Sequence, residues 1–179
     1  RIVAHGLREA SLEWQGRNRT LVWTRGESAP PSRAVPLVLA FHGSGGSGAE
    51  MAATSGLSRL ADAAGFVAVF PDGVDATWAD GRGTTPADRA GVDDVGLARR
   101  IVRAVAAETP VDPRRVYAAG YSNGGMLVQR LALEAPGLLA AAASVGAGLP
   151  EPLAGRRPVA PVPPLLLIHG TADPVVPWD

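Results

Sequence analysis

Short apolar runs alternate with amphipathic stretches along most of this chain, and this alternation constrains the fold more than any other feature of the sequence. Runs with the length of buried strands occupy residues 37–41, 66–70, 116–119, 138–145 and 165–168. Stretches with helical periodicity occupy residues 51–64, 92–108 and 124–134. Alternating strands and helices predict a single α/β domain over residues 1–179, with a mostly parallel central sheet and helices on both faces.

Two further segments complete this outline. Residues 9–25 alternate weakly around Gly16-Arg17-Asn18 and predict an N-terminal β-hairpin. Residues 71–89 are polar, contain Gly and Pro, and predict a long loop of the kind that often carries function. Parallel sheets place their sites at the carboxyl ends of the strands. We therefore expect one edge of the sheet to collect the loops that follow Phe41, Phe70, Ala119 and Ile168.

The charge balance and residue content exclude several classes of function. Lys+Arg and Asp+Glu each number 17, so the chain has no general attraction for nucleic acid or an anionic membrane. It has no cysteine, which excludes thiol chemistry, and no apolar stretch long enough to span a bilayer. The carboxylate pair Asp93-Asp94 lacks clustered partners and is expected to stabilise the start of a helix. We predict neither a metal nor a cofactor, and the oligomeric state is left open.

The strongest chemical signal is Gly120-Tyr121-Ser122-Asn123-Gly124, a G-x-S-x-G pattern between a predicted strand and a predicted helix. A nucleophile elbow requires this context, because the sharp turn strains the serine and exposes its Oγ. Glycines on either side remove Cβ atoms that would collide in so tight a turn. An ordinary turn with an incidental serine is the simpler alternative. The context favours Ser122 as a nucleophile.

A second turn, His169-Gly170-Thr171-Ala172-Asp173-Pro174, follows the last predicted strand. An acid at this place comes after the serine, as the order Ser, Asp or Glu, His requires. Asp173 would then orient an imidazole and stabilise its cation. Asp-Pro is also a common turn former, which is the alternative explanation for Asp173.

The glycine-rich segment FHGSGGSG at 41–48 is compatible with two functions. Gly43, Gly45 and Gly48 spell G-x-G-x-x-G, and Asp72 lies near the position of the ribose-binding acid, so a dinucleotide-binding oxidoreductase is one alternative. In a hydrolase, the backbone N–H groups of Ser44 and Asn123 would instead form an oxyanion hole. Only the second hypothesis also explains the serine elbow and the turn at Asp173.

These motifs resemble the polyhydroxybutyrate depolymerase/feruloyl esterase (carbohydrate esterase 1-like) family of α/β-hydrolases. The resemblance runs from about residue 37 to 177 through LAFHG (39–43), FPDG (70–73), WADGR (78–82), GVDDVG (91–96), DPRRVY (112–117), GYSNGGM (120–126) and HGTADPVVP (169–177). It implies an α/β-hydrolase fold and a secreted or periplasmic serine esterase acting on polyhydroxyalkanoate, feruloyl or acetyl esters. It also implies that Ser122 is the nucleophile, Asp173 the acid, and Ser44 with Asn123 the oxyanion hole. The candidates for substrate contact are His42, Trp78, Tyr121 and Trp178.

One departure from the family pattern concerns the catalytic histidine, which in the family follows the acid beyond one more strand. The chain contains His5, His42 and His169, none of which has that position. We expect a C-terminal truncation that removes this histidine with the last strand and helix of the fold. A catalytically dead hydrolase-like domain that binds a ligand or a partner is the alternative.

Overall fold

The central feature of the computed structural model is a seven-stranded sheet formed by the part of the chain it describes, residues 6–158 and 160–178. Its strands are β1 (Arg8–Trp14), β2 (Arg17–Arg25), β3 (Val35–Phe41), β4 (Val67–Pro71), β5 (Val111–Tyr121), β6 (Ala141–Val145) and β7 (Leu165–Ile168), in the order β1-β2-β4-β3-β5-β6-β7. β1 and β2 form an antiparallel hairpin, and β2 is antiparallel to β4. The pairs from β4 to β7 are all parallel. The predicted α/β fold with a mostly parallel sheet and an N-terminal hairpin is confirmed.

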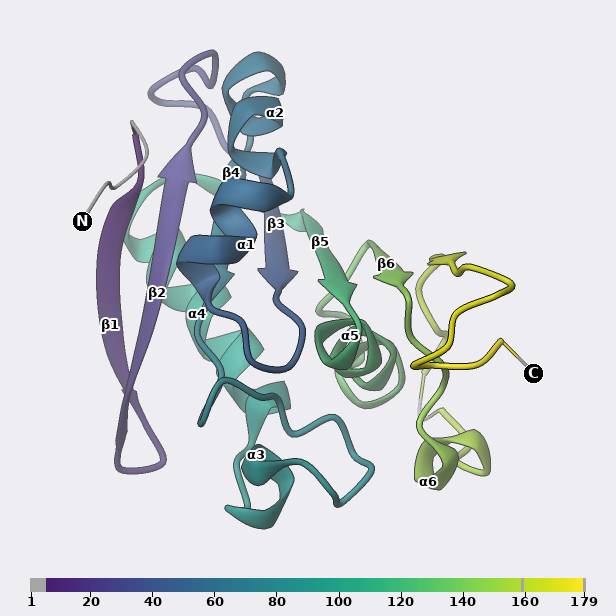
Figure 1. The fold of residues 1–179 in the computed structure, drawn as a ribbon. Coiled ribbons are helices and arrows are strands. Elements are labelled where there is room, and N and C mark those ends of the chain that lie inside the picture. Colours follow the sequence, from purple (N-terminus) through teal and green to yellow (C-terminus); the bar gives the residue numbers. More distant parts are fainter. Residues whose placement is uncertain (1–5, 159, 179) are drawn as a thin grey trace.

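Helices cover both faces of this sheet (Figure 1). On one face lie α1 (Gly48–Thr54) and α2 (Leu57–Ala64), and on the other lie α4 (Asp94–Glu108) and α5 (Asn123–Glu134). The alternation of side chains along β3 assigns the two cores, because successive residues of a strand point to opposite faces. Leu37, Leu39 and Phe41 join the α4/α5 core, whereas Val38 and Ala40 join the α1/α2 core.

The boundaries of several elements differ from the predicted ones for local reasons. The helix expected at 51–64 is two helices, because Gly56 adopts a left-handed conformation (φ 72°) that breaks the helical path. The loop expected at 71–89 contains an isolated bridge between Val74 and Thr77 and a short helix, α3 (Pro86–Arg89). The connection between β6 and β7 contains α6 (Glu151–Ala154). The hairpin turns at Gln15 and Gly16, one residue before the predicted centre.

Parallel pairing brings the carboxyl ends of β4, β3, β5, β6 and β7 to one edge of the sheet. The loops after these strands therefore share this edge, as expected, and in Figure 1 it is the lower edge of the sheet at β3 and β5. β7 lies at the end of the sheet, and Leu166, Leu167 and Ile168 are all more than half exposed. Within the described residues, no helix is both long and apolar enough to cross a membrane.

Candidate active site

The turn between β5 and α5 holds Ser122 in a strained conformation. Ser122 has φ 52° and ψ −122°, which places a residue with a Cβ in a region that only glycine adopts without cost. Such conformations cost about 1–3 kcal/mol and persist only where the surrounding structure enforces them. Ser122 lies at the N-cap of α5, but its hydroxyl makes no capping hydrogen bond. Its Oγ therefore lies uncapped at the edge of the sheet where the strand-end loops meet.

The glycines of the elbow are required by close backbone contacts. A Cβ at Gly120 would lie 2.2 Å from the carbonyl oxygen of Gly124, and a Cβ at Gly124 would lie 2.3 Å from that of Phe41. Both distances are far shorter than any real contact of a Cβ atom. These glycines let α5 begin directly against β3 and β5, as the pattern predicted.

The loop after β3 approaches the nucleophile closely. A Cβ at Gly43 would lie 3.4 Å from the Cβ of Ser122. In this loop, the amide of Gly45 donates to the carbonyl of Ala76 and the amide of Gly46 donates to that of Gly43. Within the described part of the chain, the amides of Ser44 and Asn123 have no recorded acceptor, which is a requirement for the predicted oxyanion hole.

Asp173 lies in the turn after β7 and is oriented by backbone amides. Its Oδ1 accepts hydrogen bonds from the amides of Val175 (2.9 Å) and Val176 (3.0 Å). These two bonds, chiefly the one from Val176, hold the pKa of Asp173 below its ordinary value. Its Oδ2 faces the end of β6, 4.0 Å from the position of a Cβ at Gly146. The same Oδ2 lies 3.6 Å from Nε2 of His169. A carboxylate that favours its ionised form is suited to orient an imidazole.

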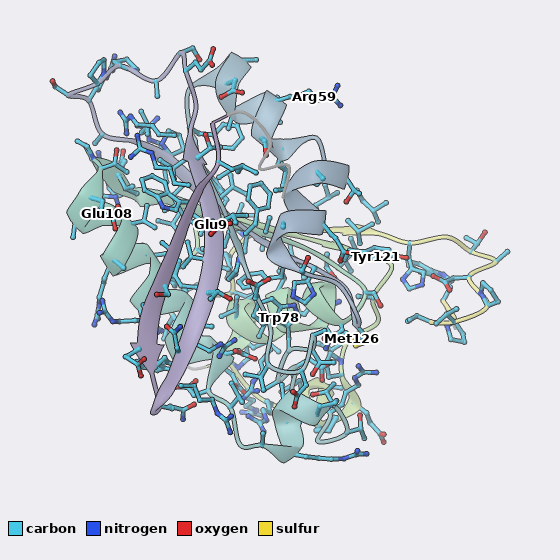
Figure 2. The ribbon with its side chains drawn as sticks, turned by 60° about the vertical axis from the view of Figure 1, so that its left-hand side comes forward. Glu9, Arg59, Trp78, Glu108, Tyr121 and Met126 are labelled. Carbon is cyan, nitrogen blue, oxygen red and sulfur yellow. The ribbon has the colours of Figure 1, made fainter. Side chains whose placement is uncertain are left out.

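The ring of Tyr121 lies between the glycine loop and the acid turn. Its Cδ1 is 3.1 Å from the position of a Cβ at Gly43, and its Cε2 is 3.3 Å from that of a Cβ at Gly146. The residue is 57% exposed, and Figure 2 shows it at the margin of the domain. Tyr121 therefore offers an aromatic surface directly beside Ser122.

His42 and Trp78, which were predicted to contact substrate, are too deeply buried to do so. Both are buried, with exposures of 3% and 0%, and Figure 2 shows Trp78 within the body of the domain. Trp78 Nε1 donates to the carbonyl oxygen of His42 (2.9 Å), and the imidazole of His42 bonds to Gly43 and Gly73. The prediction that these side chains touch substrate is corrected, because they support the loops from beneath.

The side chain of Asn123 links the elbow to the loop that follows β4. Its Oδ1 accepts from the amide of Trp78 (2.8 Å), and its Nδ2 donates to the Asp80 carboxylate (2.6 Å) and to the Trp78 carbonyl (3.2 Å). Asp80 is fully buried and is also held by the guanidinium of Arg82. We describe this set of bonds as the Asn123 latch. Through the Asn123 side chain, it ties the backbone of the elbow to the loop at residues 78–80.

A buried ion pair fixes the same loop from its other side. Asp94 at the start of α4 accepts from the amide of Ala79 (2.8 Å) and pairs with Arg19 (2.9 Å). Burial raises the pKa of Asp94, although Arg19 opposes this shift. Its neighbour Asp93 caps α4 by accepting from Gly96. The pair Asp93-Asp94 thus stabilises the helix start, as predicted, and the described residues contain no group of three or more metal-ligating side chains.

The two histidines that the structure describes both bond to backbone groups of nearby turns. His42 uses one ring nitrogen toward the Gly43 carbonyl (2.7 Å) and the other toward the Gly73 amide (3.1 Å). His169 donates from Nε2 to the carbonyl of Val176 (2.7 Å). Its ring packs against Trp178, which is exposed, with 5.5 Å between the ring centroids. Both imidazoles brace turns, while His5 lies outside the described residues.

Comparison with known proteins bears directly on this geometry. The family model described as "Esterase PHB depolymerase" matches residues 27–153, which is more than half of the chain. The chain belongs to the esterase PHB depolymerase family. This confirms the resemblance seen in the sequence, and it favours the esterase hypothesis for the glycine loop over the dinucleotide-binding one.

Relatives of this esterase family member carry related names. It is 44% identical over 144 residues to the putative esterase NocK of Nocardia uniformis subsp. tsuyamanensis, covering 80% of this chain and 42% of NocK. It is 30% identical over 154 residues to feruloyl esterase B of Piromyces equi, covering 82% of this chain and 28% of that protein. The chain thus spans less than half the length of these relatives. A solved thermostable esterase shares the fold, with a TM-score of 0.76 and 20% identity over 98% of this chain and 49% of that one.

The matched family segment contains Ser44, Ser122 and Asn123, whereas Asp173 lies beyond it. Sequence reasoning did not single out the buried polar groups that support the site. Asp80 belongs to a quoted motif, but nothing in the sequence showed that it binds Asn123. Gln129 could have been recognised from the sequence as a buried polar group, because it is a polar residue within the apolar face of a helix. Its amide donates to Ser144 and Ala147.

Proposed function

We propose that this protein is a serine hydrolase of carboxylic esters that forms an acyl-enzyme on Ser122. The observation that carries the proposal is the conformation of Ser122, which has a positive φ between Gly120 and Gly124, two positions where a Cβ would collide with backbone. Strain of this kind at an exposed turn between a strand and a helix is the hallmark of a nucleophile elbow. Membership of the esterase family supports the same reaction class.

The reaction that this geometry supports begins with attack of Ser122 Oγ on the ester carbonyl. The carbonyl oxygen becomes an oxyanion, and the free amides of Ser44 and Asn123 donate hydrogen bonds to it. Collapse of the tetrahedral intermediate releases the alcohol and leaves an acyl group on Ser122. Water then attacks the acyl-enzyme, and the carboxylic acid leaves.

A general base must remove the proton from Ser122 and return it to the leaving alcohol. We assign this role to a histidine whose second ring nitrogen donates to Oδ2 of Asp173. Neither His42 nor His169 is free to do so, because each is bonded to a loop backbone. Since backbone amides lower the pKa of Asp173 and so favour its ionised form, this carboxylate would stabilise the imidazolium.

The proposed substrate is a polyhydroxyalkanoate, a feruloyl ester or an acetyl ester. The relative named feruloyl esterase B supports an ester with an aromatic acyl group. The exposed ring of Tyr121 beside Ser122 offers such a group a stacking surface. Export to the periplasm or the medium stays a prediction from the family resemblance.

The test is active-site labelling of the intact protein with a fluorophosphonate probe, which reacts with activated serines. We expect a single adduct, located on Ser122 by peptide mass spectrometry. Ser122→Ala should lose the adduct, whereas Ser58→Ala, a matched change on α2, should keep it. An intact protein that is folded but neither labels nor hydrolyses p-nitrophenyl acetate would contradict the proposal and favour the non-catalytic binding domain.

A further inference from the structure

The two amides assigned to the oxyanion hole belong to different loops, so contacts between these loops must set their spacing. Ser44 follows β3, and Asn123 begins α5 after β5. Donors act on an oxyanion only when they lie about 2.7–3.1 Å from it, so an error in their spacing weakens the bonds. Residues 72–80, which follow β4, make hydrogen bonds to both loops. We call this segment the β4 loop.

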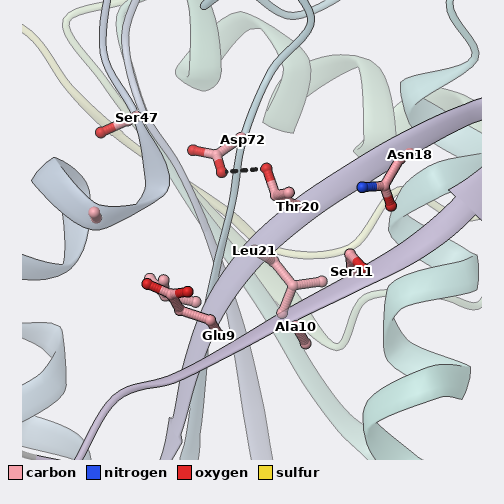
Figure 3. Close-up of a pocket in the computed structure, with 10 residues that line it drawn as sticks. Glu9, Ala10, Ser11, Asn18, Thr20, Leu21, Ser47 and Asp72 are labelled. Carbon is pink, nitrogen blue, oxygen red and sulfur yellow. Dashed lines mark hydrogen bonds between the residues drawn. The ribbon is translucent and has the colours of Figure 1, made fainter. Parts of the chain in front are cut away.

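The β4 loop is fixed at its start by Asp72, which Figure 3 shows bonded to Thr20 of the hairpin. The Asp72 carboxylate accepts from the Thr20 hydroxyl (2.6 Å) and from the amide of Gly48 (2.8 Å). Gly48 ends the glycine-rich segment at 41–48 and begins α1. Arg19 also donates to the carbonyl oxygen of Asp72 (3.1 Å). The start of the β4 loop is therefore bonded to the hairpin and to the glycine-rich segment.

The middle of the β4 loop bonds to the residue that follows Ser44. The amide of Gly45 donates to the carbonyl oxygen of Ala76 (2.9 Å). The Gly45 amide shares a planar peptide group with the Ser44 carbonyl, so this bond restrains the backbone next to the Ser44 amide. The peptide group that carries the Ser44 amide is itself restrained, because the Gly43 carbonyl in it accepts from the amide of Gly46 (3.1 Å). Both peptide groups of Ser44 are thus held, one of them by the β4 loop.

A tight turn presents the Ala76 carbonyl to the glycine-rich segment. Asp75 and Ala76 both have positive φ, 48° and 52°, and the Thr77 amide donates to the carbonyl of Val74 (3.0 Å). Positive φ at both central residues is the pattern of a type I′ turn, which favours Asn-Gly. Other residues adopt this pattern at a cost and keep it where surrounding contacts favour it. Thr77 Oγ1 makes one such contact, since it accepts from the amide of Ala87 in α3 (3.2 Å).

The end of the β4 loop bonds to the other donor residue through the Asn123 latch. Trp78 supplies its amide and its carbonyl oxygen, and Asp80 accepts from Nδ2 of Asn123 at 2.6 Å. Asp80 is fully buried, and Arg82 donates to both of its carboxylate oxygens. A hydrogen bond to a charged acceptor is stronger than one to a neutral acceptor. On this basis, Asp80 makes the strongest bond of the latch.

We propose that the β4 loop sets the spacing of the two oxyanion donors, with Asp80 as a positioning residue that acts through Asn123. The proposal rests on the proposed function and adds a buried residue to it. Bonds to an oxyanion strengthen as charge develops, so misplaced donors weaken binding of the transition state more than binding of the substrate. Loss of Asp80 should therefore lower kcat and leave KM nearly unchanged.

The first test compares Asp80→Ala with Asp80→Asn in the intact protein, with p-nitrophenyl acetate as the substrate. Asp80→Ala should lower kcat about 30-fold and change KM less than about threefold, since removal of a whole donor costs about 10²–10³-fold. Asp80→Asn keeps an oxygen that accepts from Asn123, so its kcat should stay within about fivefold of the unmodified value. An unchanged kcat in Asp80→Ala, a loss confined to KM, or equal losses in both variants would overturn the proposal.

A stability control separates positioning from a general loss of structure. Val105→Ala opens a cavity in the core about three turns after the start of α4, and it should lower the urea midpoint but not kcat. A kcat loss equal to that of Asp80→Ala would refute the positioning role. If Asp80→Ala does not fold, Thr77→Val replaces it. This change removes the contact with α3 and should lower kcat about fivefold at unchanged KM.

A double-mutant cycle tests whether Asp80 acts through Asn123. If it does, adding Asp80→Ala to Asn123→Ala should lower kcat by less than about a further twofold, because the bond between them is already lost. Losses that multiply in the double variant would show that Asp80 acts by another route, and this result would overturn the assignment.

An NMR measurement separates this proposal from the proposed function, because it needs no turnover. In the Ser122→Ala protein, Asp80→Asn should shift the ¹⁵N–¹H resonance of Gly45 as well as that of Asn123, whereas Val105→Ala should shift neither. Shifts confined to Asn123, or no shift at all, would overturn the role of the β4 loop. An unmodified protein without turnover or labelling would contradict the proposed function, while these shifts would still decide whether the β4 loop couples the two donors.

Discussion

Replacement of Asn123 by alanine tests whether the Asn123 latch holds the elbow. The change removes three side-chain hydrogen bonds and keeps the backbone amide that is assigned to the oxyanion hole. Trp78 is fully buried, so its amide would be left without a partner, at a cost of about 1–3 kcal/mol. The Asp80 carboxylate would lose a charge-assisted bond worth about 1.5 kcal/mol or more, but it would keep Arg82.

These losses together predict that Asn123→Ala lowers the free energy of unfolding by about 3–4 kcal/mol. The assay is urea denaturation followed by tryptophan fluorescence and by circular dichroism. With a slope of about 1–3 kcal/mol per molar urea, the midpoint should fall by roughly 1–4 M. An unchanged slope would show that the denatured state is the same.

Asn18→Ala provides the matched control for this measurement. Asn18 is exposed on the hairpin, and its side chain makes no hydrogen bond to any described residue. Its replacement should change the free energy of unfolding by at most about 0.5 kcal/mol. If Asn123→Ala were equally mild, the latch would contribute nothing to the fold, and the reasoning from buried partners would be refuted.

Three other changes probe separate parts of the structure. Gly124→Ala places a Cβ 2.3 Å from the Phe41 carbonyl oxygen, so we expect a loss of more than about 3 kcal/mol in thermal unfolding, and a wild-type melting temperature would refute the contact. Arg19→Met leaves the Asp94 carboxylate buried without its partner, which should cost about 3–5 kcal/mol at neutral pH. Because the pKa of Asp94 in the folded state then lies above its unfolded value, the folded state binds the proton more tightly, and urea titrations should show this loss growing as pH rises above about 4. Asp173→Asn should lower kcat by on the order of 10⁴-fold. Because the pKa of Asp173 is depressed, any limb near pH 4 or above in the pH–rate profile of the unmodified enzyme should come from another group. An acid limb that disappears in Asp173→Asn would contradict this second expectation.

The parts of the fold that the sequence predicts are those governed by local periodicity. Strands such as Leu37–Phe41 are short and wholly apolar because both faces of the sheet are covered, and their pattern shows this directly. The elbow was also predictable, since its two glycines exclude Cβ atoms within a span of five residues. Local rules failed at Gly56, where a left-handed residue divides one periodic stretch into two helices.

Contacts between distant residues account for the rest of the candidate site. Trp78 follows a strand and lies in a polar loop, so local sequence suggested a residue open to substrate. Its burial depends on His42, which is 36 residues earlier, and on Asn123, which is 45 residues later. No local pattern encodes such partners. For the same reason, the local sequence did not reveal that Arg19 of the hairpin bonds to Asp94, which lies 75 residues later.

The backbone conformation of Ser122 has a consequence for how this protein can change over time. Glycine would adopt φ 52° without strain, so Ser122→Gly should raise the melting temperature while removing the reactive hydroxyl. A chain no longer selected for ester hydrolysis would therefore become more stable through the single substitution Ser122→Gly. Under the proposed function, the strain at Ser122 lowers stability in exchange for a reactive hydroxyl at the elbow.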